Sequence, residues 1–184
     1  MPNTIDLVLL KCLKCGNRLE AEEEEIAWVC GQCGQGQQLT EAGLETLPVN
    51  WAAPRSGTAP SSAQWRPFWV FSGGVSFRQR ESYGRNNAPD ALWNNTVRFF
   101  VPAYPASLET LEQLGAKLTR EQPALRPGPP AGPLSGCTLL PEDARQAAEF
   151  IVLTIEADRK DKLKSVSFHL ELGEPELWLL PLGE

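Results

Sequence analysis

The residues of this chain that are best suited to chemistry are four cysteines in two identical C-x-x-C-G units. The first unit ends at Gly16 and the second at Gly34. Two thiolates in one such unit can bind a metal ion from a single tight turn, and a second unit completes a tetrahedral set of sulfur ligands. The spacing therefore predicts one metal site, with the ligands Cys12, Cys15, Cys30 and Cys33.

Zinc is the metal that we expect at this site, because it favours tetrahedral thiolate ligands and has no redox chemistry. The glycine after each second cysteine permits the positive φ of a sharp turn, and backbone N–H groups can then point toward sulfur. All four positions are filled by protein sulfurs, so the site has no position for water or substrate, and we interpret it as structural. Iron in the same ligand pattern, and redox-active or disulfide-bonded cysteines, are the alternatives.

On these cysteines and glycines, the segment resembles a zinc ribbon, a family in which two such units lie at the ends of short antiparallel strands. The resemblance covers residues 1–48, about a quarter of the chain. It implies structural zinc but no single function, because zinc ribbons occur in transcription factors, ribosomal proteins, enzymes and adaptors. Rubredoxins share the ligand pattern, but their core is rich in aromatic residues, whereas Trp28 is the only aromatic residue in 1–48.

Composition divides the chain into a zinc ribbon at 1–48, a linker at 49–64 and an α+β domain at 65–184. The linker is rich in Pro, Ser and Ala, and such residues bury too little apolar surface to offset the entropy cost of ordering. We therefore expect the ribbon and the larger domain to move relative to each other. Within the ribbon we predict strands at 5–9 and 26–29 and a helical turn at 41–44.

The larger domain, called the body below, is predicted to be a mixed domain with a largely antiparallel sheet and two helices. The helices are expected at 107–119 and 141–158, where capping residues precede apolar stripes. A Pro/Gly-rich loop is expected at 123–136. The strands are predicted at 65–71, 75–80, 96–101, 164–171 and 177–180. Gly73-Gly74 is interpreted as a turn or bulge, and Gly173-Glu174-Pro175 as the turn of a hairpin.

Residues 65–100 combine five arginines with many aromatic residues. Such a mixture can bind nucleic acid by stacking and phosphate contacts, can contact a protein partner, or can belong to a sheet that buries its aromatics. Alternation along a strand places Arg78 and Arg80 on one face. The candidate partner-binding residues are Arg66, Trp69, Arg78, Arg80, Arg85 and Trp93.

Two further residues, one histidine and one cysteine, have side chains capable of catalysis. His169 is the only histidine, and Cys137 is the only cysteine outside the two units. Neither has a catalytic partner nearby in the sequence, so we expect His169 on the polar face of a strand and Cys137 as a small buried residue. The chain also contains no phosphate-binding glycine motif. An enzyme with a structural zinc appendage is therefore the least favoured hypothesis.

The net charge of −6 lies mostly in the ribbon, which has three basic and eight acidic residues. An acidic ribbon repels phosphate backbones, which disfavours nucleic acid as a partner. The short apolar runs predict no membrane span, and paired C-x-x-C units are typical of a reducing compartment, here the cytoplasm. We predict a non-enzymatic zinc-ribbon adaptor or subunit that docks onto a larger protein assembly. Its contact surfaces would be the acidic turn at 22–25 and the Arg/aromatic strands. The main alternative is a nucleic-acid-binding protein that uses residues 65–100.

Overall fold

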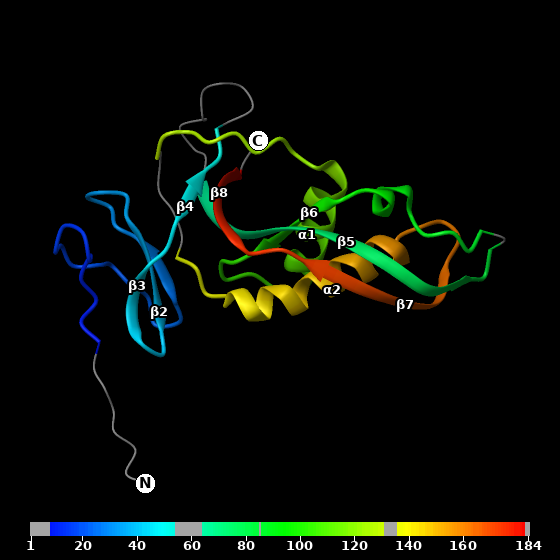
Figure 1. Ribbon diagram of the computed structural model, residues 1–184, viewed down its shortest axis with the longest axis horizontal. Coiled ribbons are helices and arrows are strands. Elements are labelled where there is room, and N and C mark those ends of the chain that lie inside the picture. Colours follow the sequence, from blue (N-terminus) through cyan, green and yellow to red (C-terminus); the bar gives the residue numbers. More distant parts are fainter. Residues whose placement is uncertain (1–7, 54–63, 85, 131–135, 183–184) are drawn as a thin grey trace, which may run out of the picture.

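The computed structural model describes residues 8–53, 64–84, 86–130 and 136–182. It confirms the predicted α+β class, with a small sheet near the cysteine units and a larger, mostly antiparallel sheet that packs with two α-helices (Figure 1). In the described part of the chain, neither helix combines the length and the apolar character that crossing a membrane requires.

The small sheet has three antiparallel strands in the order β1-β2-β3. They are β1 (Ala27–Val29), β2 (Gly36–Thr40) and β3 (Gly43–Thr46). A tight turn at 41–42 joins β2 to β3, where we had predicted a helical turn. Gly43 has a φ of +113°, and the Thr40 hydroxyl accepts a hydrogen bond from the N–H of Ala42, so local turn chemistry decides the outcome. Most of the strand predicted at 5–9 lies outside the described residues.

The large sheet has the strand order β4-β8-β5-β6, with β7 also paired to β5. Only the β4–β8 pair is parallel. The strands are β4 (Val49–Trp51), β5 (Gln64–Ser82), β6 (Val97–Pro102), β7 (Leu163–Leu172) and β8 (Glu176–Leu182).

Strand β4 lies where we had placed the start of the linker. Its Trp51 is buried and packs edge-on against Trp65, with the ring centroids 5.3 Å apart. This aromatic contact, together with the pairing to β8, orders residues that are followed by a Pro/Ser-rich stretch. Residues 54–63, which make up most of the predicted linker, lie outside the described residues.

Strand β5 is a single strand of 19 residues, so the prediction of a turn at Gly73-Gly74 was wrong. Both glycines pair with β7, and neither has a positive φ. A Cβ atom on Gly73 would collide with the carbonyl oxygen of Glu171. Glycine at this position therefore allows two strands to approach closely instead of reversing the chain.

The predicted hairpin at Gly173-Glu174-Pro175 was also wrong. Strands β7 and β8 both run antiparallel to β5, with Leu172 opposite Gly73 and Glu176 opposite Val70. Strands β7 and β8 therefore pair with successive parts of the same side of β5. The short segment 173–175 interrupts this pairing but does not reverse the chain. The N–H of Gly173 still donates to the carbonyl of Ser72.

Both predicted helices are confirmed, as α1 (Leu108–Glu121) and α2 (Pro141–Ala157). Ser107 caps α1 by accepting a hydrogen bond from the N–H of Thr110, as its position predicted. Helix α2 buries its Ala/Ile stripe against Trp69, Phe71 and Phe99 of the sheet. A second core cluster forms where Leu114 and Leu118 of α1 pack near Phe100. A short 3-10 helix, η1 (Ala91–Asn94), precedes β6.

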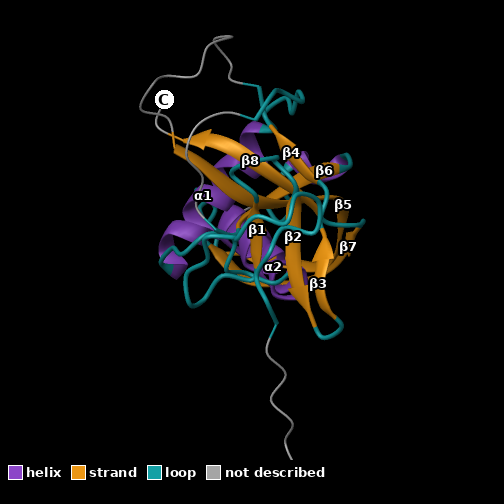
Figure 2. Cartoon of the chain, turned by 90° about the vertical axis from the view of Figure 1, so that its left-hand side faces the viewer, coloured by secondary structure: helices purple, strands orange, loops and turns teal. Residues whose placement is uncertain are grey.

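The small sheet contacts the body directly, in contrast to the flexible tether that the sequence predicted. The N–H of Ile26 donates to the carbonyl of Cys137 at 2.8 Å, and the N–H of Cys137 donates to the carbonyl of Ala27 at 3.2 Å. Ala27 is 1% exposed and belongs to the main core of the body. Figure 2 shows the three-stranded sheet standing in front of the body in this end-on view.

Candidate metal centre

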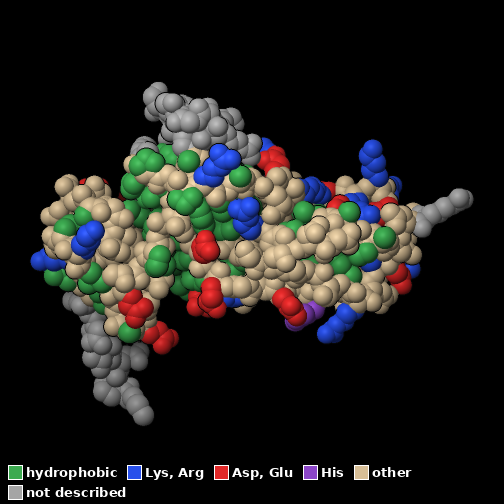
Figure 3. All heavy atoms as spheres, turned by 45° about the horizontal axis from the view of Figure 1, so that its top comes forward, with side chains coloured by type: hydrophobic (Ala, Val, Ile, Leu, Met, Phe, Trp, Pro, Cys, Tyr) green, Lys and Arg blue, Asp and Glu red, His purple; other side chains and the backbone are tan. Residues whose placement is uncertain are grey.

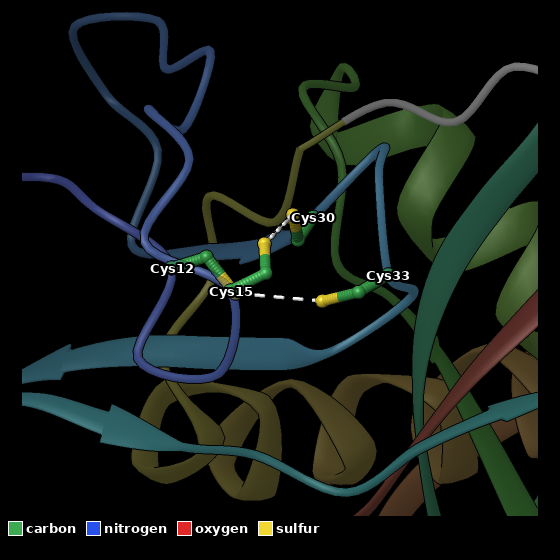
Figure 4. Close-up of side chains that lie close together, drawn as sticks. All are labelled: Cys12, Cys15, Cys30 and Cys33. Atoms are coloured by element: carbon green, nitrogen blue, oxygen red, sulfur yellow. Dashed lines mark hydrogen bonds between the residues drawn. The ribbon is translucent and has the colours of Figure 1, made fainter.

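The four cysteine side chains converge from the two C-x-x-C-G units (Figure 4). The Sγ atoms of Cys12 and Cys33 are 3.5 Å apart, those of Cys15 and Cys30 are 3.6 Å apart, and all four lie within 4.8 Å of one another. Four sulfurs placed about 2.3 Å from a tetrahedral metal ion are roughly 3.8 Å from each other. The cluster therefore has the donor set and nearly the dimensions of a four-thiolate metal site.

The two units repeat the same backbone hydrogen bonds. In each, the N–H of the first cysteine donates to the carbonyl of the residue after the glycine, at 2.8 Å in the first unit and 2.9 Å in the second. The N–H of the glycine donates to the carbonyl of the first cysteine, at 2.8 Å in both. Gly16 and Gly34 have φ values of +74° and +71°, which a side chain would strain. The glycines thus close two matching turns that aim their sulfurs at one point.

The turns also bring backbone N–H groups to the sulfurs. Burial opposes ionisation of Cys12, but hydrogen bonds from the backbone of Cys15 and Lys14 and from neighbouring thiols lower the pKa of its thiol to about 6. For Cys15, a backbone hydrogen bond from Asn17 favours the thiolate, yet burial and the neighbouring sulfurs raise its pKa to about 12. Crowded thiols cannot all ionise without a cation between them, and a bound metal ion removes that conflict.

A small apolar core packs against the four-cysteine cluster. Cys12 and Cys30 pack with the buried side chains of Leu19 and Trp28. Gln37 on β2 is fully buried, and its Oε1 accepts a hydrogen bond from the N–H of Leu13, inside the first unit, at 2.7 Å. Its Nε2 has no partner among the described residues. Sequence reasoning missed Gln37, because a polar residue in a short strand carries no sign of which neighbour it supports.

The structure separates the six residues that we had grouped as a partner-binding surface. Trp69 and Trp93 are buried in the main core, with 1% and 7% exposure, and Arg80 is 7% exposed. Arg66 lies 5.1 Å from the centroid of the Tyr104 ring, and Arg78 is exposed. Arg85 lies outside the described residues. Within the described chain, the aromatic members are therefore core residues, as the sheet interpretation of this segment predicted.

Arg78 and Arg80 do not share a face, contrary to the prediction. A register shift between Phe77 and Gln79 places an extra residue, Arg78, in β5 and breaks the two-residue alternation. Arg78 consequently points to solvent, while Arg80 points into the body.

Arg80 belongs to a buried charged network that sequence reasoning did not predict. Its Nε donates to Glu156 at 2.5 Å, and Glu156 also accepts hydrogen bonds from the Trp93 indole at 2.8 Å and from Arg159 at 3.0 Å. A hydrogen bond to Asp161, opposed by burial, raises the pKa of Arg80, and the same bond lowers the pKa of the Asp161 carboxyl. The network joins β5, η1, α2 and the turn before β7, so we interpret it as structural.

His169 and Cys137 lie where we expected them. His169 is exposed on β7, with its Nε2 3.7 Å from the carboxylate of Glu171 on the same strand. Cys137 is 2% exposed, and burial raises the pKa of its thiol to about 12. A buried thiol with a raised pKa is a poor nucleophile.

An open cleft of about 1810 Å³ separates the ribbon from part of the body. The ribbon side is lined by the acidic segment 20–25 together with Lys11 and Arg18, and the body side includes Arg66 and Pro105. Figure 3 shows hydrophobic side chains gathered near the boundary between the small left-hand lobe and the body. The acidic turn at 22–25 is thus a turn with Glu22, Glu23 and Glu24 exposed, as expected, and it also lines one side of the cleft.

The geometry establishes a four-cysteine cluster within metal-binding distance, held by two matching turns. The resemblance to a zinc ribbon remains one of motif and local geometry. Comparisons of this chain with protein-family models, with curated proteins and with solved structures found no match.

Proposed function

We propose that this protein is a non-enzymatic adaptor or subunit, in which a structural zinc ion holds a small ribbon in shape for docking onto a protein partner. The observation that carries the proposal is the convergence of four cysteine sulfurs within 4.8 Å. With four protein ligands, a tetrahedral ion has no position left for water or substrate. The ion then acts through folding, not through reaction.

Zinc suits this donor set because four thiolates favour a borderline-soft ion with no geometric preference of its own. The ribbon needs such a cross-link because the apolar core beside the cysteines is small, and in the described residues it consists of Leu19 and Trp28 packed with Cys12 and Cys30. Segments this short rarely fold on hydrophobic burial alone, and metal binding supplies the missing free energy. Zinc thus turns the segment into a rigid surface.

The cleft beside the acidic segment is the docking surface that we propose. Glu22, Glu23 and Glu24 are exposed on its wall. Glu25 fixes the shape of the turn, because its carboxylate accepts hydrogen bonds from the N–H of Glu22 at 2.9 Å and from the Trp28 indole at 2.8 Å. A rigid acidic wall favours a partner segment that carries Lys or Arg.

Quantitative affinity purification from the native cell tests this proposal. The bait proteins are the wild type, a variant that carries Glu22→Lys, Glu23→Lys and Glu24→Lys, and a control that carries Glu41→Lys and Glu45→Lys. The control changes exposed acidic residues of the same ribbon outside the cleft. Elemental mass spectrometry shows whether each bait retains zinc.

We expect one protein to be recovered in near-stoichiometric amount with the wild type and the control, and to be lost with the cleft variant. Equal recovery with all three baits would contradict the proposed surface. Recovery of nucleic acid in place of a protein would contradict the adaptor role itself.

A further inference from the structure

The edge of the large sheet at β6 is closed by the side chains of Thr119 in α1 and of Gln122, the residue that follows α1. The N–H of Phe100 donates to the hydroxyl of Thr119 at 3.2 Å, and the N–H of Arg98 donates to the side-chain carbonyl of Gln122 at 3.0 Å. Gln122 also donates back to the carbonyl of Arg98 at 2.8 Å. These side chains occupy the backbone groups that another strand would otherwise bind.

The edge at β4 is closed by the chain that follows α1. The N–H of Gly128 donates to the carbonyl of Trp51, and the N–H of Ala53 donates to the carbonyl of Arg126, both at 2.7 Å. Ala52 forms an isolated bridge with Pro127. The β6 and β4 edges of the sheet are therefore both covered by other segments of the same chain.

Strand β7 is different. It has ten residues and pairs with β5 on one side, and no described strand pairs with its other side. The only side-chain hydrogen bond to its backbone that the described residues show is from Arg145 to the carbonyl of Leu172, at 3.2 Å. A long strand edge with free N–H and carbonyl groups is a template for pairing with another strand.

The charges around β7 indicate which strand would fit. Three exposed lysines lie just before β7 or at its beginning, Lys160, Lys162 and Lys164, and three exposed glutamates lie at its end or beyond it, Glu171, Glu174 and Glu176. A second copy in the parallel direction would place lysines beside lysines and glutamates beside glutamates. A copy in the antiparallel direction places the lysine end of each β7 strand beside the glutamate end of the other strand. The two-fold symmetry produces this favourable contact twice.

We propose that two copies of this protein associate through antiparallel pairing of their β7 strands, with a two-fold axis near Phe168. Lys162 and Glu174 are equally distant from Phe168 along the chain, as are Lys160 and Glu176. A two-fold axis at this residue therefore brings the segment just before β7, which contains Lys162, close to the segment just after β7 of the second copy, which contains Glu174. Glu174 can reach this contact because its side chain is 98% exposed, and its ion pair with Arg145 of the same chain is long, at 3.9 Å.

The same two-fold symmetry places helix α2 of both copies on one face of the joined sheet. Pairing of β7 edges joins the two sheets into one, and the two-fold axis is then perpendicular to the joined sheet. Helix α2, which packs against the face of the sheet that includes Phe168, lies on the same side in both copies. Its outer surface exposes Phe150 and Leu153, at 49% and 36%, which are the apolar side chains available for contact there.

Sedimentation equilibrium of the 184-residue chain, loaded with zinc, over a wide concentration range tests the dimer. The variants are Lys162→Glu, Glu174→Lys and the charge-swapped pair of both, with Lys117→Glu on α1 as an exposed control. A single reversal turns both symmetric Lys–Glu contacts into like-charge contacts, so we expect the dissociation constant to rise about ten-fold. The charge-swapped pair should restore wild-type affinity, and Lys117→Glu should leave it unchanged.

A wild-type protein that stays monomeric up to its solubility limit would overturn the proposal. So would a dimer whose affinity does not respond to the single reversals, because its interface would lie elsewhere. Hydrogen exchange of the wild type provides a readout that needs no variant. Amides of β7 should exchange more slowly as concentration rises while those of β6 do not change, and concentration-independent exchange at β7 would also overturn the proposal.

Discussion

At the scale of single residues, Cys30 and Cys137 offer a matched pair, because both are buried cysteines and only one belongs to the cluster. We expect Cys30→Ser to lower zinc affinity by more than about 100-fold, because the ion loses a thiolate and its tetrahedral shell. Cys137→Ala should keep one zinc ion per chain. Elemental mass spectrometry after chelator competition measures both, and equal zinc loss in the two variants would contradict the assigned ligands.

Glu156 is the residue on which the buried network depends. Its carboxylate is fully buried and accepts hydrogen bonds from Arg80, Arg159 and Trp93. We expect Glu156→Gln to lower the free energy of unfolding by about 3–5 kcal/mol, because it removes the fully buried carboxylate that Arg80 and Arg159 share and leaves Asp161 to compensate both guanidinium groups. Glu149→Gln, at an exposed position of the same helix, should change it by less than about 0.5 kcal/mol. Guanidinium-induced unfolding of both variants measures the difference, and equal effects would contradict this role.

The same network gives stability a dependence on pH. The hydrogen bond from Arg80 lowers the pKa of Asp161 in the folded protein, so the folded state binds this proton less tightly than the unfolded chain does. The stabilisation is complete above the unfolded pKa of about 3.9 and is lost as pH falls through the lower folded-state pKa. Asp161→Asn should therefore show a smaller fall in unfolding free energy than the wild type when pH drops below about 4. Identical pH profiles from denaturant titrations would contradict this assignment.

At the scale of elements, the two adjacent glycines of β5 distinguish the observed strand from the predicted turn. A Cβ on Gly73 would collide with the backbone of β7, whereas a Cβ on Gly74 would meet no atom within 4 Å. We expect Gly73→Ala to lower stability by about 1–3 kcal/mol, because β7 must shift, and Gly74→Ala to be neutral or slightly stabilising. Thermal unfolding of the two variants measures this, and equal effects would contradict the close approach of β7 to Gly73.

The elements that the sequence predicted well are those whose signals are local. Helix α1 follows the Ser107 cap, and α2 begins at Pro141 and buries a regular Ala/Ile stripe, so both could be predicted to within a few residues. Two of the turns that we predicted wrongly, at Gly73-Gly74 and at 173–175, depend on partners far away in sequence. Gly73 lies opposite Leu172, and that pairing, which no local pattern encodes, overrides the usual meaning of a Gly-Gly pair.

The cysteine cluster was predictable for the same reason that the helices were, since each C-x-x-C-G unit specifies its own turn. The contacts that support it were not predictable. Gln37 supports the first unit through a single hydrogen bond to Leu13, and Ala27 joins the main core through a bridge to Cys137. Glutamine and alanine occur in many structural environments, so the residue type alone does not indicate these contacts. Only the tertiary structure reveals them.

At the scale of the whole molecule, the contact between ribbon and body determines what removal of the proposed zinc ion should do. A freely tethered ribbon would unfold alone and leave the body unchanged. In the structure, Ala27 is buried in the main core and Ile26 donates a hydrogen bond to Cys137, so unfolding of the ribbon removes packing from the body as well.

We therefore expect chelation of zinc to lower the midpoint of thermal unfolding of the body by about 5–10 °C, since the loss of a few kcal/mol shifts a chain of this size by that amount. Near-ultraviolet circular dichroism reports on the body, where Trp65, Trp69 and Trp93 are buried. Addition of zinc after chelation should restore the original midpoint. An unchanged midpoint in the metal-free protein would show that the ribbon and the body fold independently, as the linker composition alone had predicted.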